Sequence, residues 1–453
     1  MLKRKASDSI DQWIATGRNA LLVSGARQVG KTYLIRNRLK HAEQKYLEIN
    51  LIEKPEFISV LRNSNSIQDM ENNLSLATNF RFKKGESIIF IDEIQECKDI
   101  VTRIKFWVDE GSYRYVLSGS LLGIELTDLR SVPVGYLDEI QMFPLDFEEF
   151  LWGCGVNISS IDYLRKCFEK KTPVSEIAHS TMMKHFRRYL VVGGMPAAVD
   201  KYVGTNDINS VSTIQRNIIT QYRRDFTKYE SEDKKLLLKA VYDMIPSQLL
   251  KQNRRFVYSD LKKGLKAERA EDSFVWLNNA GVVIASYNAT EPKVALNQNR
   301  KSSLVKLYIS DVGLLTCMYG NTTKLDLLMD EQKLNCGGIY ENAVAQELYA
   351  HGFDEYYYNS HKLGELDFVI EYKGSILPLE IKSGKDYSVH SAINNVLDIE
   401  DFNINQAFVL SNYNISTNSR ITYYPIYMSM FITNETKLPK VDSIPDIDLE
   451  LKT

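Results

Sequence analysis

Strand-like apolar runs alternate with amphipathic stretches through the first 120 residues. The stretches at 33–39 and 99–110 carry apolar residues at helical spacing, and residues 55–80 are polar with a helical tendency. This alternation predicts a parallel sheet covered by helices on both faces. Because such sheets bind ligands at the carboxyl ends of their strands, polar residues at those ends are the first candidates for a functional site. The predicted strands are 20–23, 45–50, 87–91 and 113–118.

The pattern becomes helical from about residue 145. A Gly-Gly-Met-Pro sequence at 193–196 is typical of a break between helices. The helical spacing is found at 147–152, 181–190, 207–229 and 232–250. Two further helix-like segments are followed by two strands, an order typical of a winged helix-turn-helix. These four segments are 258–266, 271–280, 281–284 and 305–309.

The last part of the chain follows a predicted linker at 320–336. From residue 339 onward the pattern gives a helix, three strands, a helix at about 388–398 and a strand at 407–410. The polar tail from about residue 440 has few apolar positions, and we expect it to be poorly ordered.

The loop after the first strand has the pattern of a P-loop, flanked by the strand and the helix that this motif needs. Its glycines let backbone N–H groups approach phosphates, and the helix N-terminus adds partial positive charge. Lys31 is expected to reach the β- and γ-phosphates, and Thr32 to ligate Mg²⁺. A ligand-free glycine turn is the disfavoured alternative. The predicted ATP-binding residues are Gly25, Ala26, Arg27, Gln28, Val29, Gly30, Lys31, Thr32 and Tyr33.

The third apolar run ends in Asp92-Glu93, which is typical of a Walker B motif downstream of a P-loop. Asp92 is expected to hold Mg²⁺, and Glu93 to polarise the attacking water as a catalytic residue beside Lys31. A surface acidic pair after a core strand is the alternative. Ser118 and Ser120 follow the next strand and are candidates for sensing the γ-phosphate, although Ser-Gly-Ser is also ordinary turn chemistry.

Composition limits the remaining possibilities. The chain has 56 Lys and Arg against 58 Asp and Glu, a net charge of −2 that argues against a surface basic throughout. Its five cysteines show no ligand-like spacing, and no apolar run has the length needed to cross a membrane. We therefore expect a cytoplasmic chain with no membrane partner.

Residues 251–306 are locally basic, with eleven Lys and Arg against five Asp and Glu. Arg300 and Lys301 fall where the tip of a wing would lie, and a basic tip can follow a phosphate backbone. This predicts DNA contact, whereas a domain that only docks on protein would carry the same charge as a solvated excess.

Carboxylates gather in the last α/β unit. In a strand residues i and i+2 share a face, so Glu380 lies with Lys382, and Asp367 with Glu365. Asp367 and Glu380 are candidate Mg²⁺ ligands with Glu341 on the preceding helix, and Lys382 is a candidate for stabilising negative charge. Asp367, Glu380 and Lys382 would then be catalytic. The alternative is that these carboxylates only form salt bridges.

Several segments together resemble one prokaryotic family of AAA+-type P-loop ATPases over almost the whole chain. They are 24–32, 90–95, 117–120, 143–151, 193–196 and 222–225. That family carries a C-terminal region related to PD-(D/E)XK nucleases, and the helix glutamate and Asp…Glu-x-Lys residues here match that signature. After 131–135 the family usually continues with Arg or Lys, where this chain has Tyr136. The candidates for a phosphate-sensing arginine are then Arg130, Arg187, Arg188, Arg223 and Arg224, with Arg224 preferred.

The resemblance implies an ATPase core and a restriction-endonuclease-like C-terminal domain, and the residue pattern places a helical lid and a winged helix between them in an α/β architecture. We expect their boundaries at 1–145, 146–230, 231–320 and 337–440, with a polar tail at 441–453. The predicted function is Mg²⁺-dependent ATP hydrolysis coupled to a DNA-binding C-terminal module, with nuclease activity of that module left open. The alternative is a nucleotide-switched regulator or scaffold whose C-terminal domains only bind partners. A homo-oligomer is compatible with both.

Overall fold

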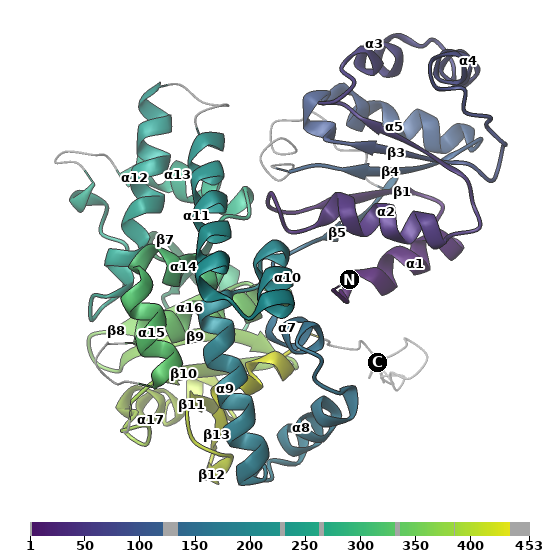
Figure 1. The fold of residues 1–453 in the computed structure, drawn as a ribbon. Coiled ribbons are helices and arrows are strands. Elements are labelled where there is room, and N and C mark those ends of the chain that lie inside the picture. Colours follow the sequence, from purple (N-terminus) through teal and green to yellow (C-terminus); the bar gives the residue numbers. More distant parts are fainter. Residues whose placement is uncertain are drawn as a thin grey trace, which may run out of the picture.

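The computed structural model describes residues 2–120, 135–226, 232–261, 267–330, 336–384 and 386–434. Figure 1 shows two bodies, one built on the N-terminal sheet and a larger one built from the rest of the chain. No helix within these residues has the length and apolar character needed to cross a membrane. The five cysteines are all free thiols.

The N-terminal body is a five-stranded sheet in which every neighbouring pair is parallel, in the order β2-β3-β4-β1-β5. Separate apolar clusters line its two faces, so the prediction of a parallel sheet covered on both sides is confirmed. The strands are β1 (Ala20–Ser24), β2 (Tyr46–Asn50), β3 (Ile88–Asp92), β4 (Arg114–Ser118) and β5 (Leu137–Gln141). The helices are α1 (Ala6–Thr16), α2 (Lys31–His41), α3 (Glu56–Asn63), α4 (Ile67–Thr78) and α5 (Asp99–Glu110), with a 3₁₀ turn η1 at Ile94–Glu96.

A run of helices follows, as the periodicity predicted. Side chains cap several of their N-termini; Asp146, for example, accepts a hydrogen bond from the Glu149 backbone at 2.8 Å. At the predicted break, Gly194 allows a close approach, because a Cβ there would lie 2.0 Å from the Leu145 carbonyl oxygen. The helices are α7 (Phe147–Gly153), α8 (Ile158–Lys170), α9 (Glu176–Val192), α10 (Pro196–Thr205), α11 (Ile208–Asp225) and α12 (Glu232–Leu249).

The second sheet has eight strands in the order β12-β13-β11-β10-β9-β8-β6-β7. The predicted two-stranded ribbon is the antiparallel pair β6-β7, and β6 also pairs in parallel with β8. The ribbon expected for a winged helix therefore shares one sheet with the C-terminal unit, and the predicted domain boundaries stay a prediction. The strands are β6 (Val283–Ala289), β7 (Arg300–Ile309), β8 (Tyr356–Ser360), β9 (Gly364–Tyr372), β10 (Ser375–Lys382), β11 (Ala407–Ser411), β12 (Ser416–Asn418) and β13 (Ile421–Pro425).

The helices around this sheet correct one prediction, because the predicted linker contains α15 (Asn321–Met329). The helix predicted at 258–266 begins with a 3₁₀ turn, η2 (Tyr258–Asp260), and residues 262–266 lie outside the described residues. The expected order of the last unit, helix, three strands, helix, strand, is present and is extended by β12 and β13. The remaining helices are α13 (Ala267–Asn279), α14 (Val312–Tyr319), α16 (Gly337–Ala350) and α17 (Ser391–Leu397), with 3₁₀ turns η3 (Leu296–Asn299), η4 (Glu400–Phe402) and η5 (Ile426–Phe431).

One large apolar cluster joins the helices that follow residue 145 to the second sheet. It runs from α7 through α9, α11, α14 and α16 into β10, β11 and η5. Burial of this apolar surface packs these helices and strands against one another. The polar tail predicted at 441–453 lies outside the described residues.

Candidate functional site

The P-loop leaves β1 and enters α2 through a backbone that only glycine adopts without strain. Gly25 and Gly30 have φ of 136° and 94°, and a Cβ on Gly25 would lie 2.1 Å from the Met142 carbonyl oxygen. Lys31 opens α2 with its side chain buried, and its ammonium donates to the Gly25 and Ala26 carbonyls at 2.8 Å each. Burial lowers the pKa of Lys31 to about 8, although the nearby charges of Glu93 and Asp92 oppose the shift.

Asp92, at the end of β3, gathers three hydrogen-bond donors. Thr32 Oγ1 lies 3.0 and 3.1 Å from its two oxygens, and Ser118 donates to Oδ1 at 2.8 Å. Asn50 donates to Oδ2 at 3.1 Å, a contact that sequence analysis missed. The strand register explains the cluster, since Asn50, Asp92 and Ser118 are directly paired at the ends of β2, β3 and β4. The structure thus brings the P-loop threonine and the predicted Walker B aspartate together.

Glu93 follows Asp92 in a left-handed conformation, with φ of 59°. Non-glycine residues rarely adopt this conformation, which costs free energy and aims the side chain away from the strand direction. Its carboxylate accepts a hydrogen bond from Gln95 Nε2. Glu93 therefore lies at the rim of the cluster with its side chain already oriented.

The second predicted sensor residue has a different partner. Ser120 Oγ accepts a hydrogen bond from Arg27 Nε at 3.1 Å, and Arg27 Nη1 lies 2.7 Å from Asp225 Oδ1 at the end of α11. The Tyr222 hydroxyl donates to the Arg27 carbonyl at 2.9 Å. The last turn of α11 is thereby bound to the P-loop. Tyr33, by contrast, points into solvent.

Two of the arginines proposed as phosphate sensors form ion pairs with carboxylates of the second body, and the role expected of Arg224 stays a prediction. Arg223 pairs with Asp243 at 2.7 Å, and Arg187 with Asp330 at 2.6 Å. Arg224 and Arg188 are exposed, and Arg130 lies outside the described residues.

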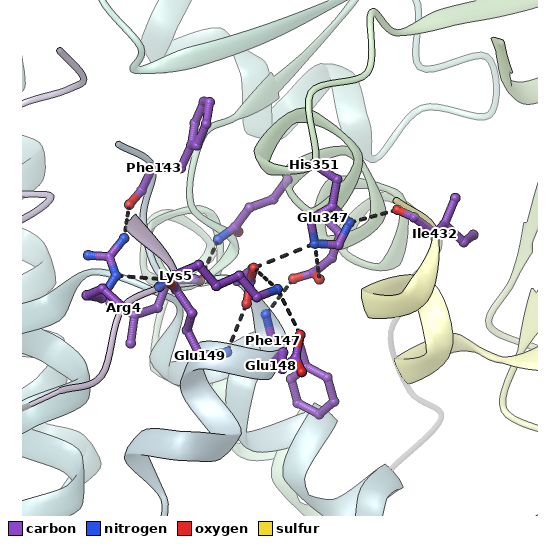
Figure 2. A network of polar contacts seen from close by, with 12 residues as sticks. Arg4, Lys5, Phe143, Phe147, Glu148, Glu149, Glu347, His351 and Ile432 are labelled. Atoms are coloured by element: carbon purple, nitrogen blue, oxygen red, sulfur yellow. Dashed lines mark hydrogen bonds and ion pairs between the residues drawn. The ribbon is translucent and has the colours of Figure 1, made fainter. Parts of the chain in front are cut away.

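A buried polar network joins the N-terminus, the P-loop and the second body (Figure 2). Arg4 donates to the Val29 carbonyl of the P-loop at 2.9 Å, to the Phe143 carbonyl at 2.7 Å and to Glu149 at 3.0 Å. Lys5 pairs with Asp146 at 2.7 Å and with Glu148 at 2.9 Å. These contacts fix the start of α7 beside the P-loop.

The same network continues to α16. The Phe147 backbone donates to Glu347 Oε1 at 2.7 Å, and His351 Nε2 lies 3.6 Å from Asp146 Oδ2. Burial and the nearby charge of Asp146 raise the pKa of Glu347 to about 7. Burial alone would raise the pKa of Asp146, but Lys5 and His351 hold it well below its usual range.

The C-terminal carboxylates lie on neighbouring elements, and each has a cation or donor. Glu341 on α16 is fully buried, is paired with Arg254, and accepts from the Tyr308 hydroxyl at 3.3 Å. Asp367 Oδ1 lies 3.8 Å from the same guanidinium, and its Oδ2 accepts from the Ile381 backbone at 2.8 Å.

The carboxylates of Glu380 and Glu365 each form an ion pair with a lysine. Lys382 lies 2.8 Å from Glu380, and Lys306 lies 2.8 Å from Glu365. Burial and Asp367 raise the pKa of Glu380 to about 7, against the opposing charge of Lys382. In the part of the chain that the structure describes, no group of three or more His, Cys, Asp or Glu could hold a metal ion. The predicted Mg²⁺ site here stays a prediction.

Several charges of the basic segment 251–306 are paired within the protein, some of them at the surface. Arg254 and Lys306 pair with the carboxylates above, and Lys251 and Lys293 pair with Asp260 and Asp401. Arg300 stacks on Tyr287, with 3.5 Å from the guanidinium carbon to the ring centroid. The net charge of the segment therefore overstates the basic surface that a nucleic acid would meet.

A strand, a glycine-rich loop with a buried lysine, and an aspartate–threonine contact at the end of β3 define a P-loop nucleotide-binding site. Residues 17–151 match the family model described as an AAA domain. Residues 183–325 and 336–428 match two domains of unknown function, DUF8612 and DUF4143. No curated protein matches the chain.

Solved structures show distant similarity. The Walker-type ATPase paby2304 of Pyrococcus abyssi is 16% identical, with 70% of this chain and 96% of that chain covered and a TM-score of 0.44. The ORC1 protein of Aeropyrum pernix, solved in complex with DNA, is 13% identical, with 72% and 95% covered and a TM-score of 0.33. Because TM-scores below 0.5 do not establish a shared fold, the assignment of the AAA domain rests on the family model.

Proposed function

We propose that the AAA domain binds ATP with Mg²⁺ and hydrolyses it at the carboxyl ends of β1, β3 and β4. The contact of Thr32 with Asp92, beside the buried ammonium of Lys31, carries this proposal. The Lys31 ammonium is bonded to carbonyls of its own loop, a position from which it can turn to phosphate oxygens. The oxygens of Thr32, Asp92 and Ser118 form the kind of hard donor set that suits Mg²⁺. These residues therefore fit both the phosphates of ATP and Mg²⁺.

Each residue then has a defined role. The backbone of residues 25–32 would cradle the phosphates, and Lys31 would hold the β- and γ-phosphates. Thr32 and Asp92 would hold Mg²⁺, which when bound neutralises phosphate charge. Glu93, oriented by Gln95, would accept a proton from the attacking water.

The test is Mg²⁺-dependent release of phosphate from ATP. Lys31→Ala is expected to abolish both ATP binding and release. Glu93→Gln should keep ATP binding and lower kcat at least a hundredfold, within the range of about 10²–10⁴-fold that a general base contributes. Glu96→Gln, at an exposed position three residues away, is the matched control. Unchanged hydrolysis in Lys31→Ala or Glu93→Gln would refute the proposed site.

For the output of the ATPase, we propose a C-terminal module directed at DNA. The adjoining positions of Asp367 and Glu380 beside Lys382, together with the exposed Lys301, support this proposal. The cation partners of Glu341, Glu365 and Glu380 favour the alternative, a nucleotide-switched scaffold. Stimulation of ATP hydrolysis by DNA would support the first, and DNA-indifferent turnover the second.

Cleavage needs its own test. If the C-terminal carboxylates are a nuclease site, the wild-type chain should cut DNA or RNA with Mg²⁺ or Mn²⁺, and Asp367→Ala should lose cutting while ATP hydrolysis remains. Glu371→Ala, a carboxylate further along β9, is the control. No cutting by the wild-type chain on either nucleic acid would favour the scaffold.

A further inference from the structure

We infer that Arg27 is the arginine that contacts the γ-phosphate, and that Asp225 on α11 holds its guanidinium in the conformation seen here. The inference rests on the proposed ATP site. It gives Arg27 the phosphate-sensing role for which the sequence favoured Arg224. It also links that site to the helix that enters the second body.

The guanidinium of Arg27 lies at the same sheet edge as the Asp92 cluster. Its Nε donates to Ser120 at 3.1 Å, just beyond the end of β4, where Ser118 donates to Asp92. Arg27 is also one of the charges that act on Lys31. Two cations close together at the end of a parallel sheet, beside a helix N-terminus, form a site for a polyanion.

Asp225 restrains this arginine from the other side. Its carboxylate is buried and lies 2.7 Å from Arg27 Nη1, 198 residues apart in sequence. Tyr222 and Gln221, in the same turn of α11, bond to the Arg27 carbonyl and to the Gln28 side chain. A terminal phosphate offers more charge and more acceptor oxygens than a carboxylate, so it can compete for a guanidinium.

Competition of this kind would couple nucleotide state to α11. When the guanidinium turns to a phosphate, the ion pair with Asp225 is weakened, while the neutral contacts of Tyr222 and Gln221 with the loop remain. α11 packs on α10 and α14, whose apolar residues belong to the core of the second body. The γ-phosphate would thus be sensed by Arg27, which is already bound to the second body through Asp225.

Carboxylates of the second body hold two of the other candidate arginines. Arg223 pairs with Asp243 on α12, Arg187 pairs with Asp330, and Arg188 and Arg224 are exposed on their helices. Arg223 therefore supplies a matched control. It lies on the same turn of α11 as Asp225, and its ion pair with Asp243 has the same 2.7 Å length as the pair of Arg27 with Asp225.

The experiment compares ATP with ADP in equilibrium binding to the full chain, and adds kcat. Because ADP lacks the γ-phosphate, Arg27→Ala should lose about tenfold or more of the preference for ATP while its affinity for ADP changes little. Its kcat at saturating ATP should also fall. Arg27→Lys should recover part of the preference, and Arg223→Ala should behave as the wild type.

Asp225→Asn provides an independent readout. It frees Arg27 from its carboxylate partner, so ATP affinity should rise several-fold relative to ADP. An unchanged ATP-to-ADP ratio in Arg27→Ala, or a reduced ratio in Asp225→Asn, would overturn the inference and leave the ATP site intact. A wild-type chain that binds neither nucleotide would instead overturn the proposed site on which the inference rests.

Discussion

Replacement of Arg4 by alanine tests whether the buried polar network holds the P-loop against the second body. Arg4 contributes a buried ion pair with Glu149 and two hydrogen bonds to the carbonyls of Val29 and Phe143. Its side chain is 8% exposed and that of Glu149 is 5% exposed. Without the guanidinium, the Glu149 carboxylate would keep the Lys5 backbone N–H at 2.6 Å but no longer pair with Arg4.

The expected cost follows from this burial. Removal of one partner from a buried ion pair destabilises a protein by about 3–5 kcal/mol. Burial already raises the pKa of Glu149, so the carboxyl can take up a proton when Arg4 is absent, and this places the cost near the lower end at neutral pH. We therefore expect Arg4→Ala to lower the free energy of unfolding by about 3 kcal/mol.

Arg38→Ala is the matched control. Arg38 pairs with Asp11 at 2.5 Å in the same body, but the two side chains are 27% and 41% exposed. Exposed pairs contribute about 0–1 kcal/mol. Urea unfolding followed by tryptophan fluorescence measures both variants, and the midpoint of Arg4→Ala should fall well below that of Arg38→Ala. Equal midpoints for the two variants would refute the reasoning.

Three further predictions concern other parts of the chain. The pKa of Glu347 is about 7 in the folded chain, against 4.5 for an ordinary glutamate, so the free energy of unfolding should fall as the pH rises between these values. Glu347→Gln should flatten this fall when urea unfolding is measured at several pH values, and an unchanged slope would contradict the prediction. Arg254→Ala leaves the buried Glu341 carboxylate without its cation. Added Mn²⁺ should therefore raise the melting temperature of Arg254→Ala and not that of the control Arg255→Ala. Equal responses of the two variants would exclude a latent metal site. Changing Arg300 and Lys301 to Glu should weaken DNA binding and its salt dependence, whereas changing the exposed Lys83 and Lys84 should not; an unchanged affinity would remove this patch from the proposal.

The nucleotide-site pattern was predictable because its signals are local. A buried apolar strand followed by glycines, or by an aspartate, needs only a few adjacent residues to be recognised. β5 was missed because only two of its five residues, Leu137 and Ile140, are apolar and neither is fully buried, so it lacks a continuous apolar run. Asn50 was missed because a single amide at a strand end carries no motif, and its role depends on the register with Asp92.

Contacts between residues far apart in the chain could not be predicted, because no local pattern marks them. The contact of Arg27 with Asp225 joins residues 198 positions apart, and that of Arg254 with Glu341 joins residues 87 apart. The two-stranded ribbon was correctly predicted from its own apolar pattern. Its parallel pairing with β8, which places Tyr287 opposite Tyr356, depends on packing between distant segments and leaves no periodic signal.

The central claim is that the loop around Lys31 is a site for ATP, and equilibrium titration of labelled ATP with Mg²⁺ tests it most directly. The account predicts saturable binding by the wild-type chain and by Lys40→Ala, whose lysine is exposed at the end of the same helix. It predicts no binding by Lys31→Ala. Equal binding by Lys31→Ala and the wild-type chain would contradict the account.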